Sequence, residues 1–190
     1  MKFKKIIDLC KKSKRFLFFN LPNMQWLTDG HAIYPLEGLP YLDSDYICRM
    51  FDINDSQKNK IFFDSKSALP DNLNFNDTDP TESVTDIDDM CIIYGGTTII
   101  PLKTERGLKF IDNRFLMPFA DINRNDLYIT LRIGTDGTEY FAVKQGLLLQ
   151  GIVLPYDVVN ENFVDKLNEL YRLSDLALNN QKSKSIKSDT

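Results

Sequence analysis

The chain has 190 residues, of which 43% are hydrophobic and 26% charged, and its formal net charge is −4. This composition is typical of a globular protein with one large domain or two small ones. The negative balance argues against a protein whose whole surface binds nucleic acid, although it leaves room for a local basic face.

The first part of the chain alternates apolar segments with turn signals. Apolar residues from Phe3 to Cys10 recur at helical spacing, so one face of a helix over residues 3–13 is expected to be buried. Asp29-Gly30 lies between two apolar runs and predicts a hairpin turn. The elements expected here are a helix at 3–13, strands at 15–20, 24–28, 31–36 and 61–63, and a short helix at 43–51.

Residues 64–89 differ from the rest in composition, because they hold eight acidic residues and one basic residue, Lys66. Proline and asparagine are frequent there, which indicates a solvated loop or linker. Asp77-Thr-Asp79-Pro-Thr81 matches the DxDxT signature of haloacid-dehalogenase-like phosphatases, but the buried strand that this signature requires before it is missing. A metal held by Asp77, Asp79 and nearby acids remains an alternative, and would make the chain a metal-dependent enzyme.

The later part of the chain reads as antiparallel strands followed by a helix. Gly95-Gly96 predicts a second hairpin, and Asn160 predicts the start of an amphipathic helix. Elements are expected at 90–94, 97–102, 112–119, 127–133, 138–144 and 147–154. The predicted organisation is a helix-plus-hairpin half at 1–76, an acidic loop or linker at 77–89, an antiparallel half at 90–158, an amphipathic helix at 159–178 and a disordered tail at 179–190.

Catalytic patterns are weak in this sequence. His31 is the single histidine, so it would have to serve any Ser–His–Asp or Cys–His site, and no nucleophile elbow accompanies it. Neither a GxGxxG nor a P-loop pattern occurs. We therefore expect a protein that binds without catalysis and needs no cofactor or metal.

The cysteines and the apolar runs indicate an intracellular protein. Cys10, Cys48 and Cys91 lie far apart and form no CxxC pair, so they predict neither a disulfide framework nor a zinc site. Reduced thiols fit a cytoplasmic protein. Apolar runs such as Phe16–Phe19 are too short to span a membrane, so no membrane association is expected.

The first predicted helix carries a candidate contact surface for nucleic acid. Its lysines occur in two pairs spaced by seven residues, which places both pairs on one side of the helix. Such a face can meet phosphates without sequence preference, or it can simply be solvated. The candidate DNA-contact residues are Lys4, Lys5, Lys11 and Lys12.

One motif carries a family resemblance. Thr28-Asp-Gly-His31, followed by Ala32-Ile33, resembles the bacterial sliding clamp, the β subunit of DNA polymerase III, in which a strand ends in Thr-Asp-Gly-His-Arg before an apolar strand. Residues 41–51 resemble the extended entry of the clamp into a short helix. The end of the antiparallel half, Gly151-Ile-Val-Leu-Pro155, is similar to the segment on which clamps end.

The resemblance implies a fold, a site and partners. The fold would be α+β, with clamp-like antiparallel sheets, two or three short helices packed on them and an added C-terminal helix. The two matching segments would meet and line a pocket for short peptide motifs of replication proteins. Its residues would be Thr28, Gly30, His31, Ile33, Ile152 and Leu154. The lysine-bearing helix would face double-stranded DNA.

The sequence also departs from the clamp pattern. Ala32 replaces the arginine of the motif, residues 64–89 fall where clamp strands are expected, and the C-terminal helix has no counterpart. The chain could close a small ring as a homo-oligomer or have lost ring formation. It is also similar to small proteins of phages and prophages. The main alternative is therefore a protein–protein interaction module of a phage or prophage without a DNA role, with the C-terminal helix as its contact face.

Overall fold

A computed structural model describes residues 2–87 and 90–188 of the chain. The predicted α+β class is confirmed. The chain forms two units, residues 1–156 and 157–190. Within the described residues, no helix has the length and apolar character needed to cross a bilayer.

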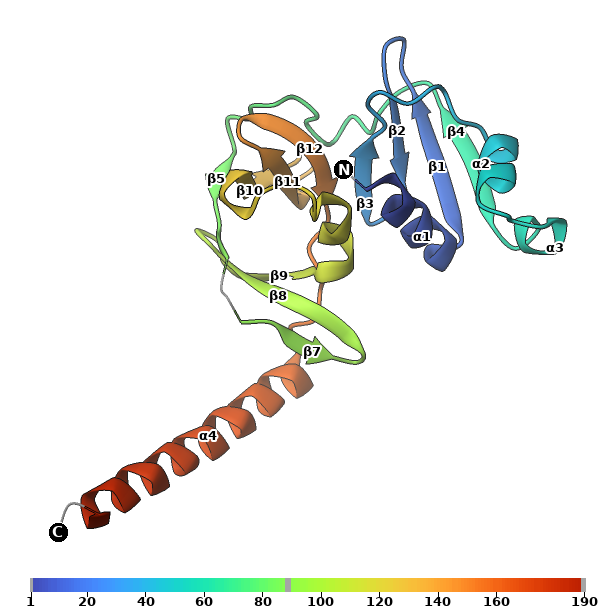
Figure 1. The fold of residues 1–190 in the computed structure, drawn as a ribbon. Helices are drawn as coiled ribbons and strands as arrows, with labels where there is room; N and C mark the ends of the chain where they lie inside the picture. Colours follow the sequence, from blue (N-terminus) through green and yellow to red (C-terminus); the bar gives the residue numbers. More distant parts are fainter. Residues whose placement is uncertain (1, 88–89, 189–190) are drawn as a thin grey trace. The chain divides into compact units, whose positions relative to one another are not determined.

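The first unit contains strands and short helices whose bounds largely follow the sequence prediction (Figure 1). Its helices are α1 (Phe3–Ser13), α2 (Ser44–Met50), α3 (Asp55–Lys58), and the 3₁₀ helices η1 (Asn113–Phe119) and η2 (Arg124–Asp126). Its strands are β1 (Arg15–Asn20), β2 (Gln25–Thr28), β3 (Ala32–Pro35), β4 (Phe62–Lys66), β5 (Ser83–Val84), β6 (Asp86–Ile87), β7 (Ile92–Tyr94), β8 (Thr97–Thr104), β9 (Gly107–Asp112), β10 (Leu127–Ile133), β11 (Glu139–Gln145) and β12 (Leu148–Val153).

The larger sheet joins strands from both ends of the first unit. In the described residues it has the order β4-β1-β2-β3-β12-β11-β10-β5, and β1 pairs with β4 in parallel. The smaller sheet places β8 between β9 on one edge and β6 with β7 on the other. The parts expected as two halves, 1–76 and 90–158, therefore share one continuous sheet.

The continuity of the larger sheet depends on the pairing of β3 with β12. Ile33 lies opposite Ile152 in this antiparallel pair. One residue beyond the strand, the Leu154 amide donates to the His31 carbonyl at 2.8 Å. This junction brings together residues that are more than a hundred positions apart in the sequence.

Gly151 allows the junction to close. A Cβ at this position would lie 3.0 Å from the Ile33 carbonyl oxygen and 2.9 Å from Cζ of Phe119. Both distances are shorter than ordinary carbon contacts, so a larger residue would push β12 away from β3 or displace the Phe119 ring.

Alternate residues of the larger sheet enter two separate cores, as the two-residue period of a strand requires. Phe16 and Phe18 of β1 pack with Ile6 and Ile7 of α1 in the first core. Leu42 and Ile47 around α2, Phe115 and Phe119 of η1, and Leu102 and Ile111 of the smaller sheet complete that core. Because α1 turns its apolar side toward this face, Lys4, Lys5 and Lys12 on its other sides are exposed.

The second core lies on the opposite face, where Leu17 and Phe19 of β1 pack with Trp26. It is covered by residues 67–82, which we call the crossing segment. Leu69, Leu73 and Phe75 of this segment pack against the sheet, and the Phe75 and Trp26 rings lie edge to face at 5.2 Å. The segment expected as a solvated loop or linker is thus partly a cover for the sheet.

A buried arginine fixes the crossing segment to the sheet. The Arg132 side chain on β10 is fully buried, and its Nη2 lies 2.5 Å from Oε2 of Glu82. Lys144 on β11 donates to the other carboxylate oxygen of Glu82 at 2.8 Å. Arg132 also donates to backbone carbonyls of Asn74, Asn76 and Asp77. Most of the donors of this guanidinium are therefore used to hold the segment in place.

Glu82 stays charged in this network. Burial alone would raise its pKa, but the hydrogen bonds from Lys144 and Arg132 outweigh that effect and lower the pKa below the ordinary value of 4.5. The negative charge of Glu82 therefore partly offsets the charges of the buried Arg132 and Lys144.

The second unit contains helix α4 (Glu161–Ser188). The Asn160 side chain accepts a hydrogen bond from the Phe163 amide at 3.0 Å, which is the N-cap that the sequence predicts. Leu170 and Tyr171 belong to its apolar stripe and are exposed. The structure describes this helix to Ser188. The disordered tail expected from residue 179 stays a prediction.

The Arg132 network makes a testable contribution to stability. Replacing Arg132 by Met leaves the Glu82 carboxylate with Lys144 but without the guanidinium, and it removes the donor to three backbone carbonyls. We therefore expect the free energy of unfolding to fall by about 3 kcal/mol. Urea denaturation followed by the fluorescence of Trp26 measures this change. The control is Arg106→Met, whose partner Glu139 lies 3.5 Å away at the surface, and we expect it to change stability by less than about 0.5 kcal/mol. Equal losses for the two variants would contradict the role assigned to Arg132.

Candidate functional site

The Thr-Asp-Gly-His segment forms the turn between β2 and β3. The Gly30 amide donates to Oγ1 of Thr28 at 2.9 Å, and the amides of His31 and Ala32 donate to Oδ1 of Asp29 at 2.9 and 3.1 Å. Gly30 has φ of +101°, a conformation that favours glycine. Thr28, Asp29 and Gly30 thus stabilise the turn, and the turn places His31 at the surface.

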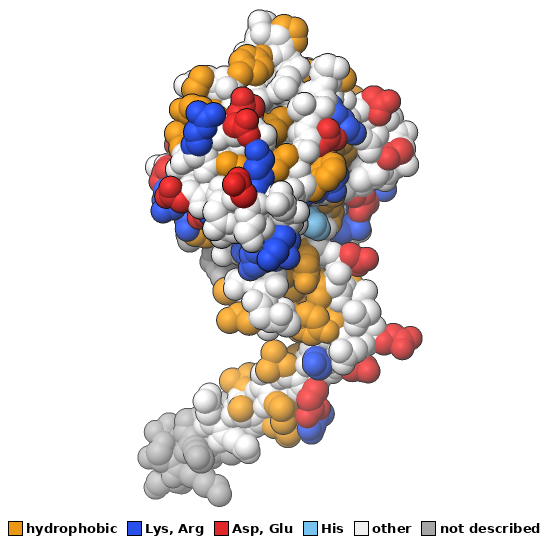
Figure 2. All heavy atoms as spheres, turned by 90° about the vertical axis from the view of Figure 1, so that its right-hand side faces the viewer, with side chains coloured by type: hydrophobic (Ala, Val, Ile, Leu, Met, Phe, Trp, Pro, Cys, Tyr) orange, Lys and Arg blue, Asp and Glu red, His pale blue; other side chains and the backbone are white. Residues whose placement is uncertain are grey.

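The His31 imidazole is held against an aromatic ring. It stacks on Phe115 with 5.7 Å between ring centroids and an interplanar angle of 14°. The Phe115 carbonyl accepts a hydrogen bond from the Tyr34 hydroxyl at 3.0 Å. Burial raises the pKa of Tyr34 well above its ordinary value, so the hydroxyl keeps its proton and remains a donor. The histidine side chain is 66% exposed, and Figure 2 shows the imidazole of this single histidine among basic side chains.

A cavity of about 240 Å³ lies on one side of His31, and we call it the apolar groove. All six residues predicted for the peptide pocket line it, namely Thr28, Gly30, His31, Ile33, Ile152 and Leu154. The structure therefore brings together the residues named from the resemblance. It also adds Arg15, Leu17, Phe19, Pro70, Asn72, Leu73 and Thr138.

The floor of the apolar groove is the face of the sheet around the β3–β12 junction. Leu17 of β1, Ile33 of β3 and Ile152 of β12 are buried and point to this same face. Their apolar side chains can take up apolar side chains of a ligand. The polar groups of Arg15 and Thr138 can orient it.

The crossing segment supplies a wall of the apolar groove. The Asn72 carbonyl accepts a hydrogen bond from the Thr135 amide at 3.1 Å, and Nδ2 of Asn72 donates to Oδ2 of Asp136 at 2.9 Å. A Cβ at Gly134 would lie 2.4 Å from the Asn72 carbonyl oxygen. Because only glycine leaves room for this approach, the turn after β10 sets the position of the wall.

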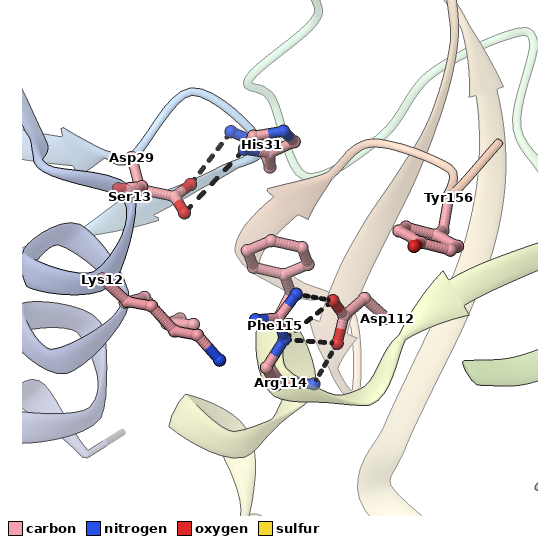
Figure 3. Close-up of a pocket in the computed structure, with 9 residues that line it drawn as sticks. Lys12, Ser13, Asp29, His31, Asp112, Arg114, Phe115 and Tyr156 are labelled. Carbon is pink, nitrogen blue, oxygen red and sulfur yellow. Dashed lines mark hydrogen bonds and ion pairs between the residues drawn. The ribbon is translucent and has the colours of Figure 1, made fainter. Parts of the chain in front are cut away.

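A second cavity of about 280 Å³ lies on the other side of His31, and we call it the polar pocket (Figure 3). Leu9, Lys12 and Ser13 of α1 line it together with Asp29, His31, Asp112, Arg114, Phe115 and Tyr156. In Figure 3 Lys12 reaches toward Arg114 from α1, while Arg114 and Phe115 approach from the start of η1, just after β9. His31 is therefore shared by the two cavities.

An ion pair is built into the polar pocket. The Asp112 side chain is completely buried, and Nε of Arg114 donates to both of its carboxylate oxygens, at 3.0 and 2.8 Å. Asp112 raises the pKa of Arg114, mainly through these hydrogen bonds, so the guanidinium stays charged. The negative charge of the buried Asp112 is thereby compensated by the guanidinium of Arg114.

The predicted DNA-contact lysines differ in exposure. Lys4, Lys5 and Lys12 of α1 are exposed, whereas Lys11 is half-buried and its Nζ donates to the Phe51 carbonyl at 3.4 Å. Three of the four side chains are therefore available for an external contact.

The acidic residues suggested as metal ligands are engaged in backbone contacts. Oδ1 of Asp77 accepts from the Leu149 amide at 2.8 Å, and Oδ1 of Asp79 accepts from the Thr81 amide at 2.7 Å. Within residues 2–87 and 90–188, no three His, Cys, Asp or Glu side chains are grouped so that they could hold a metal ion. The structure does not bring these acids together as a site.

Comparisons of the chain with protein-family models, with curated proteins and with solved structures give no match.

Most of the groove residues that the sequence analysis missed fall into two classes. Leu17 and Phe19 alternate with Phe16 and Phe18 along β1, so the strand period could have placed them on the face of Ile33. Residues 70–73 lie in a segment whose acidic composition indicated a solvated loop, although the segment also contains apolar residues. Only the packing of that segment against the sheet assigns it to the groove.

The turn that presents His31 depends on the Asp29 carboxylate. Asp29→Ala leaves the His31 and Ala32 amides without their acceptor, and we expect it to lower the free energy of unfolding by about 2 kcal/mol. Asp29→Asn keeps an oxygen at Oδ1 and is expected to lose less than about 1 kcal/mol. Urea denaturation distinguishes the two variants. If they lose the same stability, the acceptor role of Asp29 is wrong.

Proposed function

We propose that this chain is a clamp-like replication accessory protein without catalytic activity, and that its apolar groove holds short peptide motifs of replication proteins. The observation that supports the proposal is the meeting of the two segments that resemble sliding clamps. Thr28–Ile33 and Ile152–Leu154 line one groove, with their strands paired side by side.

The shape and chemistry of the groove suit an extended peptide. Its floor offers buried aliphatic side chains at Ile33 and Ile152 and a half-buried one at Leu154. A ligand that places one or two large apolar side chains there would gain roughly 1.5–3 kcal/mol for each side chain that it buries. The half-buried Asn72 and Thr138 can hydrogen-bond the peptide backbone.

Leu154 provides the sharpest test of peptide binding, because it lines the groove without belonging to the fully buried core. A displayed library of short peptides that contain two adjacent large apolar residues should yield ligands for the native protein. Leu154→Ala should then weaken their binding about tenfold, as measured by fluorescence anisotropy, because the lost contacts are worth about 1.4 kcal/mol.

Leu147→Ala is the matched control, because Leu147 is 79% exposed just before β12 and lies outside the groove. Its affinity should equal that of the native protein. A library that yields no ligand, or equal weakening by the two variants, would refute the proposed peptide site.

The exposed lysines of α1 favour a second activity, contact with the DNA backbone. Lys4 and Lys5 lie side by side in the sequence of the first turns of α1, and neither is buried. A contact of this kind is electrostatic, without sequence preference, and weakens steeply as salt rises.

If α1 contacts DNA, removing its positive charges should lower the affinity of the protein for DNA. The double variant Lys4→Gln/Lys5→Gln should bind a double-stranded oligonucleotide more weakly at low salt and show a smaller dependence of affinity on salt, by a slope change of about 1 to 2. Lys60→Gln/Lys66→Gln removes the same charge from exposed positions outside α1 and serves as the control. Equal affinities of the two double variants would rule out a specific role of α1 in DNA binding.

A further inference from the structure

We propose that helix α4 pairs in antiparallel orientation with α4 of a second copy of this chain, through an apolar stripe along one side of the helix. The inference is independent of the proposed peptide and DNA contacts. Three observations carry it. The stripe is exposed, its residues repeat at a spacing that suits a second helix, and the two halves of α4 differ in charge.

The stripe runs along one side of α4. Val164, Tyr171 and Leu178 follow one another at intervals of seven residues, which is about two helical turns, and they are 42, 75 and 48% exposed. Leu167, three residues after Val164, and Leu170, three residues after Leu167, widen the stripe. The five side chains therefore form one apolar surface on the helix.

Most of this surface has no packing partner within the chain. From residue 168 to residue 181, every residue of α4 is exposed. Helices in proteins owe most of their stability to the packing of an apolar face, and isolated helices are only marginally stable in water. A partner that covers the stripe would therefore both remove apolar side chains from water and stabilise the helix.

The spacing of the stripe suits a second copy of the same helix. A repeat of seven residues lets two helices stay in contact along their length. Tyr171 lies at the centre of the repeat, so two antiparallel copies that cross there would place Val164 of one copy opposite Leu178 of the other.

The length of α4 is sufficient for such a pair. Its 28 residues extend about 40 Å at ~1.5 Å per residue. Two helices of this length side by side bury on the order of 1,000 Å² in total, which is near the lower limit for a specific interface. We therefore expect a dimer that dissociates on dilution.

The charges of α4 favour the antiparallel orientation. Residues 161–175 include four acidic and two basic residues, whereas residues 176–188 include three lysines and no acidic residue. Parallel helices would align like charges, and antiparallel helices would align the acidic half of one copy with the basic half of the other. In a pair centred on Tyr171, the position of Lys182 lies opposite the start of the other α4, next to Glu161.

The same charges argue against a membrane surface as the partner. Helices that lie on membranes are rich in Lys and Arg on their polar side, which attract anionic lipids. The polar side of the first half of α4 instead carries Glu161, Asp165 and Glu169. A second copy fits both features, because it supplies an identical apolar stripe and the opposite charge at each end.

The first test measures the association of the full chain by sedimentation equilibrium. We expect the 22.0 kDa chain to exchange with a species of twice that mass, with a dissociation constant in the micromolar range. Leu170→Glu should weaken the dimer about a hundredfold or more, because each dimer loses two buried leucines, each worth about tenfold. The matched control is Leu176→Glu. Leu176 is 50% exposed on the side of α4 away from the stripe, so its dissociation constant should not change.

The second test determines the orientation by disulfide cross-linking. The exposed Cys91 is first replaced by Ser, and the two other cysteines are buried. In this background, Val164→Cys and Leu178→Cys should form a cross-linked dimer when the two variants are mixed and oxidised, because antiparallel pairing brings these positions together. Each variant oxidised alone should stay uncross-linked on a non-reducing gel.

Three results would overturn the proposal. A chain that stays monomeric up to about 1 mM has no such interface, because even a weak pair would form at that concentration. Equal dissociation constants for Leu170→Glu and Leu176→Glu would place the dimer contact outside the stripe. Cross-linking of Val164→Cys with itself, but not with Leu178→Cys, would show parallel helices.

Discussion

The pairing of β3 with β12 is the constraint on which the rest of the structure depends. It is short, with Ile33 opposite Ile152 and one further hydrogen bond from the Leu154 amide to the His31 carbonyl. Yet it joins the first four strands of the larger sheet to the last four, and it places the apolar groove over the joint. Gly151 keeps the joint closed because any side chain there would meet the Ile33 carbonyl.

The groove needs a wall as well as a floor, and the crossing segment provides it. Its position is set above all by the contact of Glu82 with the buried Arg132. On the other side of the groove, the turn at Asp29-Gly30 holds His31 between the two cavities. A site whose floor and borders are already held in place loses less conformational entropy when a ligand binds, and this favours affinity.

Local patterns predicted most of the elements but few of their long-range partners. The helical spacing in α1, the aromatic residues of β1 and the glycine turns predicted the bounds of these elements closely, because each signal lies within a few residues. The resemblance of Thr28–His31 to the sliding-clamp motif predicted six of the residues that line the apolar groove. The role of residues 67–82 was missed because it depends on Arg132, about fifty positions away. β9 was missed although it forms a local hairpin with β8, in which Thr104 lies opposite Gly107.

The most direct test of the central claim is a two-dimensional ¹H–¹⁵N NMR titration of the labelled chain with an apolar-pair peptide selected from the library. If the β3–β12 junction forms the floor of the binding site, the amide signals of Gly30, His31 and Leu154 should shift together and saturate with one affinity. Signals that shift only in α4 or at the sheet edges β4 and β5, with those three unchanged, would contradict a peptide site at the junction.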